Sequence, residues 1–244
     1  MKKLLALVLT ALASQLAGAA TTEEDVAHYV EAVGGPKDVR IKAMDDLAWK
    51  GISDARVFDL IEQHLLTELA SDSAAERNEI DHEIRALSFS GQAKYMPTLQ
   101  KVVADSRYSR YGRTATTDLP YYARWNPIIS DRSTFNPQYS DDDNRLLNML
   151  HSNDLVLKRL AAKRVYFDIK DQVVLDAMAL EIKANFHNKH SGDDADAVAW
   201  MVKALGSSGQ AQYRPLFQEA AASSPDHEVV SHANRVLEKH YPNP

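Results

Sequence analysis

An internal repeat constrains this 244-residue chain more than any other feature. The stretch SGQAKYMPTLQ at residues 90–100 returns as SGQAQYRPLFQ at residues 208–218. Over the longer windows 86–106 and 204–224, 11 of 21 aligned residues are identical, which is far above chance. We interpret this as a duplication. Chains with internal duplications usually build repeat architectures, whose stacked helices offer surfaces on which other molecules dock.

The first residues predict a secretory signal peptide at 1–19. Lys2 and Lys3 precede an apolar run at 4–13, and Ala17-Gly18-Ala19 provides the small side chains that a signal peptidase requires. The apolar run is too short to span a bilayer, and a buried first helix would not account for all three features together. We therefore expect cleavage after Ala19 or one residue later. The mature chain is then periplasmic or secreted, with no integral membrane segment.

Composition narrows the chemistry that the chain can perform. It has no Cys, which excludes disulfides, thiol nucleophiles and thiolate metal sites. Without Lys2 and Lys3, 26 basic and 34 acidic residues remain, a net charge of −8 with His neutral. Acids and bases are interspersed, whereas proteins that bind nucleic acid usually carry a basic segment. We expect no nucleic-acid partner.

Helical spacing of apolar residues predicts an all-α fold. It divides the mature chain into a first half at 20–119, a crossover at 120–139 and a second half at 140–244. Thr22 and Ser140, each followed by three acids, are expected to cap the first helix of each half. The duplication predicts that two sets of core residues occupy equivalent buried positions: Ile80, Ile84 and Leu87 in the first half, and Val198, Val202 and Leu205 in the second.

Short motifs resemble those of HEAT repeats. The motif DVR at 38–40, followed by Ala43 and Leu47, resembles the start of the second helix of a HEAT hairpin. The pattern Y-x-P-x-L/F at 95–99 and 213–217 resembles the start of a first helix. The chain thus resembles a HEAT-like repeat protein of the short-repeat type also seen in phycobilisome lyases. This resemblance implies an α-α superhelix, or solenoid, of about six helical hairpins in two duplicated halves. It implies no lyase activity, because HEAT repeats are shared far more widely than that activity.

The crossover at 120–139 contains Pro120, Pro127 and Pro137 and is rich in aromatic residues and arginine. Three prolines predict an extended segment rather than a long helix. Its rings, led by Trp125, have two interpretations. They either form a binding hot spot or fill the joint between the halves.

The resemblance also implies that the second helix of each hairpin lines a concave binding face. Outward positions on those helices are therefore the predicted protein-binding residues, with Trp125 of the crossover as a second choice: Trp49, His82, Arg85, Trp125, Trp200, Lys203 and Arg235. We expect Trp49 or Trp200 to anchor the partner, since large amphipathic rings contribute most on open surfaces. The alternative is that each ring covers the neighbouring hairpin.

No sequence motif indicates catalysis or a metal site. A nucleophile elbow, a phosphate loop and a dinucleotide fingerprint are all missing from the sequence. His187-x-x-His190, followed by Asp193, Asp194 and Asp196, has the residue types of a metal site, but helix-end effects account for it. We expect no catalytic residue, cofactor or metal. The predicted function is an exported, non-catalytic protein that binds another protein as a scaffold or assembly factor. The alternative is an enzyme or small-ligand binder with a site in the cleft between the halves.

Overall fold

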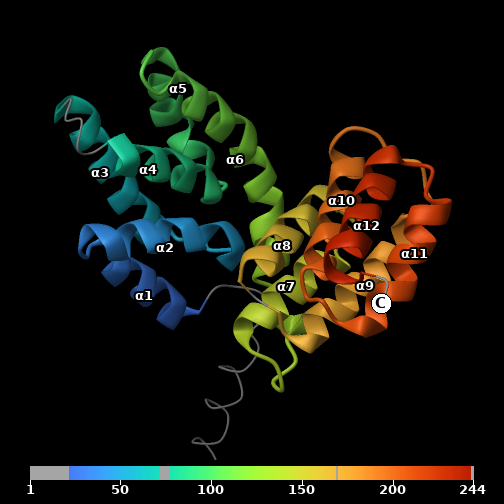
Figure 1. The fold of residues 1–244 in the computed structure, drawn as a ribbon. Helices are drawn as coiled ribbons and strands as arrows, with labels where there is room; N and C mark the ends of the chain where they lie inside the picture. Colours follow the sequence, from blue (N-terminus) through green and yellow to red (C-terminus); the bar gives the residue numbers. More distant parts are fainter. Residues whose placement is uncertain (1–21, 72–76, 169, 243–244) are drawn as a thin grey trace, which may run out of the picture. The chain divides into compact units, whose positions relative to one another are not determined.

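The computed structural model describes residues 22–71, 77–168 and 170–242. Within these ranges the chain is all-helical, with twelve α-helices, three short 3-10 turns and no strand (Figure 1). The predicted signal peptide lies outside the described residues. Among the helices that are described, none is long and apolar enough to cross a membrane. The chain divides into two compact units, the first ending at Phe135 and the second beginning at Asn136.

The first unit contains six α-helices in three successive pairs: α1 (Glu23–Val33), α2 (Lys37–Lys50), α3 (Ala55–Ser71), α4 (Arg77–Phe89), α5 (Met96–Ala104) and α6 (Ser109–Ile129). Helices within each pair pack together. Between pairs, α2 packs on α4 and α4 packs on α6, while α1 packs on α3 (Figure 1).

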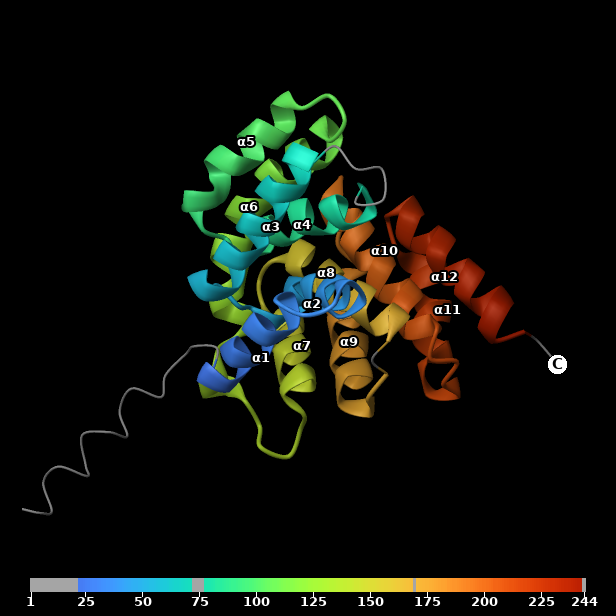
Figure 2. The same cartoon turned by 90° about the vertical axis from the view of Figure 1, so that its left-hand side faces the viewer.

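The second unit contains another six: α7 (Asp141–His151), α8 (Leu155–Phe167), α9 (Gln172–Asn185), α10 (Asp193–Gly206), α11 (Arg214–Ser223) and α12 (His227–His240). Its contacts follow the same order as in the first unit. The pairs α7–α8, α9–α10 and α11–α12 pack together, and α8 packs on α10 as α10 packs on α12 (Figure 2). Each helix–helix contact of the first unit named above thus has a counterpart six helices later.

Both predicted helix caps are confirmed. The hydroxyl of Thr22 accepts a hydrogen bond from the backbone N–H of Asp25 at 3.1 Å, and the Asp25 carboxylate accepts one in return from the Thr22 N–H. Ser140 accepts from the Asp143 N–H at 3.0 Å. These hydroxyls satisfy N–H groups that a helix start would otherwise leave unpaired.

The predicted core positions are also confirmed. Ile80, Ile84 and Leu87 are buried on α4, and their three counterparts on α10 are completely buried. A tyrosine–aspartate hydrogen bond between successive helix pairs also occurs at matching positions in the two units. Tyr95 donates its hydroxyl proton to Asp59 at 2.8 Å in the first unit, and Tyr213 donates to Asp176 at 2.6 Å in the second.

Gly91 and Gly209 end the duplicated α4 and α10 segments in a left-handed conformation, each with φ +66°. Glycine adopts this conformation without the steric cost that a Cβ would bring. The surroundings of the two glycines differ. A Cβ on Gly91 would lie 2.5 Å from the backbone nitrogen of Ala123 in α6, whereas a Cβ on Gly209 would have no atom within 4 Å.

The expected extended crossover is wrong over residues 120–129. There α6 continues as a single 21-residue helix through Pro120 and Pro127, beyond the expected limit at Leu119. Both prolines lie on its exposed side. The other side of α6 carries a buried stripe that includes Leu119 and Ile129. Each proline costs about 3 kcal/mol, and burying several large side chains at about 1.5–3 kcal/mol each offsets that cost.

Asn126 near the end of α6 holds three segments of the first unit together. Its buried side-chain amide donates to the carbonyl of Phe89 and to the hydroxyl of Ser53, both at 2.8 Å, and to the carbonyl of Ser90 at 3.2 Å. The turns that follow α2 and α4 are thereby fastened to α6.

Candidate functional site

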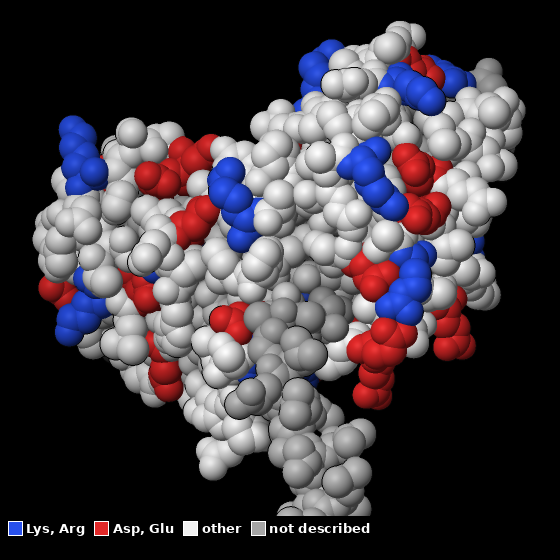
Figure 3. Space-filling view, turned by 180° about the vertical axis from the view of Figure 1, so that it is seen from behind, with Lys and Arg blue, Asp and Glu red and all other residues white. Residues whose placement is uncertain are grey.

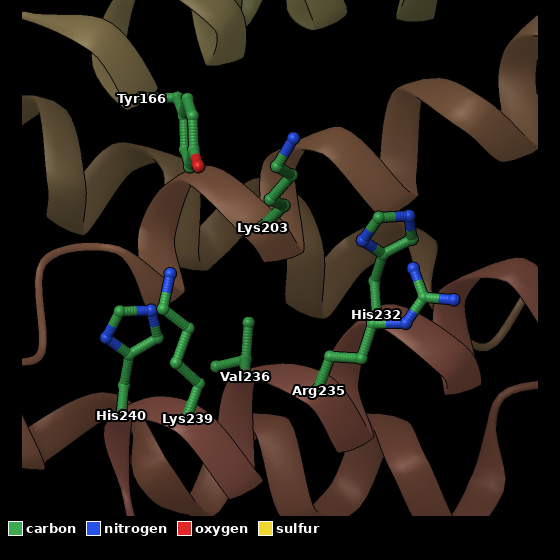
Figure 4. Close-up of a pocket in the computed structure, with 7 residues that line it drawn as sticks. All are labelled: Tyr166, Lys203, His232, Arg235, Val236, Lys239 and His240. Carbon is green, nitrogen blue, oxygen red and sulfur yellow. The ribbon is translucent and has the colours of Figure 1, made fainter.

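A pocket of about 210 Å³ lies on the second unit, along α12. We call it the α12 pocket. Its lining comes from α8, α10 and α12: Tyr166, Lys203, His232, Arg235, Val236, Lys239 and His240. Figure 4 shows the five α12 side chains rising from one side of that helix toward Tyr166 and Lys203. The hollow therefore faces side chains from the second helix of three successive pairs.

The spacing of residues on α12 explains this arrangement. Val229, Ala233 and Val236 are buried and attach the helix to α10 and α11. His232, Arg235 and Lys239 follow at i, i+3 and i+7, so they share a neighbouring face of the helix. Packing of the apolar stripe thus directs the basic stripe into the pocket.

The pocket is electropositive. Lys203, Arg235 and Lys239 carry three permanent charges, and no carboxylate lines the hollow. Within the described part of the chain, none of the three forms an ion pair with an acid. Burial lowers the pKa of His232 and of His240, and neighbouring cations lower both further. Both imidazoles are therefore neutral at pH 7.

Aromatic rings hold Lys203 at the edge of the pocket. Its ammonium nitrogen lies 4.0 Å from the centre of the Trp200 ring and 4.5 Å from that of Tyr166. The ammonium nitrogen of Lys163 also lies over the Trp200 ring, 5.3 Å from its centre. These cation–π contacts fix the direction of the side chain without neutralising its charge.

The predicted binding residues fall into separate groups. Two of them, Lys203 and Arg235, line the α12 pocket, and a third, Trp200, lies against Lys203. In the first unit, Asp45 bridges two more: its carboxylate lies 2.7 Å from His82 Nδ1 and 3.8 Å from Arg85 Nη1. The side chains of His82 and Arg85 thus already have an acidic neighbour.

The two remaining predicted residues are rings of the first unit. Trp49 is half-buried near the end of α2. Trp125 is only 6% exposed and packs against Tyr121 and Tyr122, with ring centres 5.2 and 5.3 Å apart. Trp125 is therefore part of the core of the first unit, and a partner could not reach most of its ring. Burial of Trp125 inside the first unit favours a packing role for this ring over an exposed binding hot spot.

The histidine and aspartate cluster near α10 has other partners. Arg159 binds Asp193 at 2.9 Å and Asp196 at 2.7 Å. His190 Nε2 lies 3.0 Å from the carbonyl of Asn185, and His187 lies 3.6 Å from Glu219. The side chains named here do not converge on a common point.

Sequence reasoning missed five of the seven residues that line the α12 pocket, namely Tyr166, His232, Val236, Lys239 and His240. A signal for His232 and Lys239 was present. Basic residues at spacing i, i+3 and i+7 on the last helix mark a cationic stripe beside the apolar one, and such a stripe indicates an anion-binding face. Tyr166 carries no such signal, because only the packing of α8 on α10 brings it to the pocket.

The charge of this pocket contrasts with the wider surface. On the face drawn in Figure 3, Lys and Arg side chains are interspersed with Asp and Glu. Three unpaired cations around one hollow suit a ligand with several carboxylates or a phosphate group. No protein-family model, curated protein or solved structure matches the chain.

Proposed function

We propose that this chain is a non-catalytic binding protein whose α12 pocket receives an acidic segment of a partner protein. One observation carries the proposal: Lys203, Arg235 and Lys239 surround a hollow with no acid in its lining. Three cations that line one hollow repel one another, and a bound anion offsets that repulsion. Trp200 beside Lys203 adds a ring of the kind that contributes strongly at protein interfaces.

The repeat architecture supports the same proposal. We infer a HEAT-like solenoid in which α1–α6 and α7–α12 are duplicated halves, on the basis of the repeated motifs and the matching order of helix contacts. In such proteins the second helices form the binding face, and the α12 pocket is lined by second helices only. We further propose export to the periplasm or beyond, on the basis of residues 1–19. N-terminal sequencing of the secreted protein, expected to begin at Ala20 or Thr21, tests that part.

The binding proposal is tested with a fluorescently labelled hexaglutamate peptide and the mature protein, measured by fluorescence anisotropy at several salt concentrations. The pocket variant carries Lys203→Glu and Arg235→Glu. The control carries Lys183→Glu and Lys189→Glu, which make the same change in net charge at exposed positions outside the pocket. We expect at least a tenfold loss of affinity in the pocket variant, about 1.4 kcal/mol.

The same pair of variants is then used to capture proteins from an envelope extract, with mass-spectrometric quantification. A partner that depends on the pocket is retained by the control and lost from the pocket variant. The proposal is refuted if both variants bind the peptide as tightly as the wild type, or if both lose affinity equally, since general charge would then explain the binding.

A further inference from the structure

Three potential metal ligands meet between α3 and α4 in the first unit. His64 and Glu68 are four residues apart on α3 and therefore lie on one face of that helix, and Glu83 faces them from α4. His64 Nδ1 lies 3.7 Å from a carboxylate oxygen of Glu83 and 3.9 Å from one of Glu68. One ligand atom from each residue fits within 4.8 Å of the others.

Glu83 is the unusual member of this group. Its side chain is 0% exposed, and neither carboxylate oxygen accepts a hydrogen bond from a protein N–H or O–H donor in the described residues. A buried carboxylate normally has several such donors, because burial without them costs several kcal/mol. Glu83 instead points at an imidazole and at a second carboxyl group, that of Glu68.

The basic groups nearest to Glu83 are bound to another acid. Arg40 and Lys37 are close, but both bind Glu79, with Lys37 Nζ at 3.1 Å and Arg40 Nε at 2.5 Å. Another donor of Arg40 binds the carbonyl of Gly35. The basic groups are thus engaged one helical turn away, which leaves two carboxyl groups and one imidazole facing one another.

The electrostatics of the group follow from its burial. Burial, together with Glu68 and Glu79, raises the pKa of Glu83 to about 9 against a lowering by Arg40. Burial and the charge of Arg40 lower the pKa of His64. The side chain of His64 is 39% exposed, which gives solvent access to the group.

We propose that His64, Glu68 and Glu83 bind one divalent transition-metal ion of the Zn²⁺ class, joining α3 to α4. Two carboxylates and a neutral imidazole balance the charge of one such ion. In a tetrahedral zinc site, ligand atoms about 2.0–2.2 Å from the metal are roughly 3.4 Å apart. The two His64 spacings of 3.7 and 3.9 Å need to close by a few tenths of an ångström to reach this value, and the three ligand atoms already lie within 4.8 Å of one another.

The donor set also argues against hard cations. Ca²⁺ takes six to eight oxygen ligands and Mg²⁺ retains a largely hydrated octahedral shell, whereas this group offers one nitrogen and two carboxylates. Three protein ligands leave the fourth position of a Zn²⁺ ion open to water or to another molecule. The sequence predicted no metal here, since the ligands are spread over two helices without a recognised motif.

The test titrates chelator-treated, full mature protein with ZnCl₂ by calorimetry and with CoCl₂ by visible absorption, in the presence of excess Mg²⁺. We expect one Zn²⁺ per chain and the intense absorption of low-coordinate Co²⁺. Glu83→Gln and His64→Gln should each weaken Zn²⁺ binding more than tenfold. Both replacements preserve side-chain size or lie near the surface, and circular dichroism confirms their folding. His187→Gln, which alters an exposed histidine beside Glu219, serves as the matched control and should bind as the wild type does.

Three outcomes would overturn the proposal. The first is a wild-type protein that binds no Zn²⁺. The second is Zn²⁺ binding that survives in both Glu83→Gln and His64→Gln, which would place the ion at another histidine. The third is Ca²⁺ or Mg²⁺ binding as tight as that of Zn²⁺, which would contradict the assigned class of cation.

Discussion

The matched glycines Gly91 and Gly209 allow one steric contact to be measured in isolation. Both have φ +66°, so replacing either by Ala imposes the same left-handed strain of about 1 kcal/mol. The added Cβ at Gly209 meets no atom within 4 Å. At Gly91 it would lie 2.5 Å from the nitrogen and 2.6 Å from the Cα of Ala123, both of them backbone atoms of α6.

An ordinary contact of this kind is about 3.4 Å or longer, so α6 must move by almost 1 Å or the turn must open. Helix movement disturbs Tyr122 and Trp125, whose buried rings on α6 pack against each other. Overpacking of this kind typically costs 1–3 kcal/mol. We therefore expect Gly209→Ala to lower the free energy of unfolding by about 1 kcal/mol and Gly91→Ala by about 2–4 kcal/mol.

Equilibrium urea unfolding followed by circular dichroism at the helix band measures this difference, with midpoint and slope fitted for each variant. Equal losses of stability in the two variants would show that α6 does not press on the turn after α4. A larger loss in Gly209→Ala would show that the environments of the two glycines have been assigned the wrong way round.

Three further predictions concern the core, the α6 anchor and the pocket. Leu87→Ala and Leu205→Ala should each cost about 2–5 kcal/mol in urea unfolding, because both side chains are completely buried; a loss below 1 kcal/mol at either would contradict that burial. Asn126→Ala removes bonds to two turns and should cost about 2–4 kcal/mol, while thermal melts as stable as the wild type would refute its anchoring role. The pKa of His232 is lowered from its ordinary value of 6.5, so protonation adds a charge to the α12 pocket only below that pH, and the affinity for hexaglutamate should rise as the pH falls below 6.5. His232→Gln should reduce that gain, and a pH profile that this substitution leaves unchanged would exclude the residue.

Local signals in the sequence predicted most helix positions. Thr22 and Ser140 act as caps because a hydroxyl before a run of acids satisfies helix N–H groups whatever the tertiary fold. The periodic apolar stripe likewise placed Ile84 and Leu87 in the core. In both cases the decisive interactions lie within a few residues of the chain, where sequence reasoning is strongest.

The helix α6 shows where that reasoning fails. Pro120 and Pro127 are unfavourable inside a helix, and the local signal correctly registers this cost. The compensating term is burial of Leu119, Tyr122 and Ile129 against helices that are far away in the sequence. Only the tertiary structure reveals which of these opposing terms is larger.

Both candidate sites also depend on tertiary packing that the sequence does not reveal. Lys203 and Arg235 were identified as outward-facing residues, but their convergence with Tyr166 depends on how α8, α10 and α12 pack. No sequence motif marks the group of His64 and Glu83, because the packing of α3 on α4 brings these side chains together in space. A sequence pattern along one helix therefore cannot predict a site whose residues come from several helices.

The matched hydrogen bonds of Tyr95 and Tyr213 also indicate a part of the chain that tolerates a change in length. Donor and acceptor are 36 residues apart in the first unit and 37 apart in the second, yet both bonds form. Under the proposed duplication, one residue was gained or lost between them, and the helices kept their register. The connection from α9 to α10 is thus a permissive position. An insertion beside Gly192, where an added Cβ would meet no neighbouring atom, offers a place to attach a probe without displacing the α12 pocket.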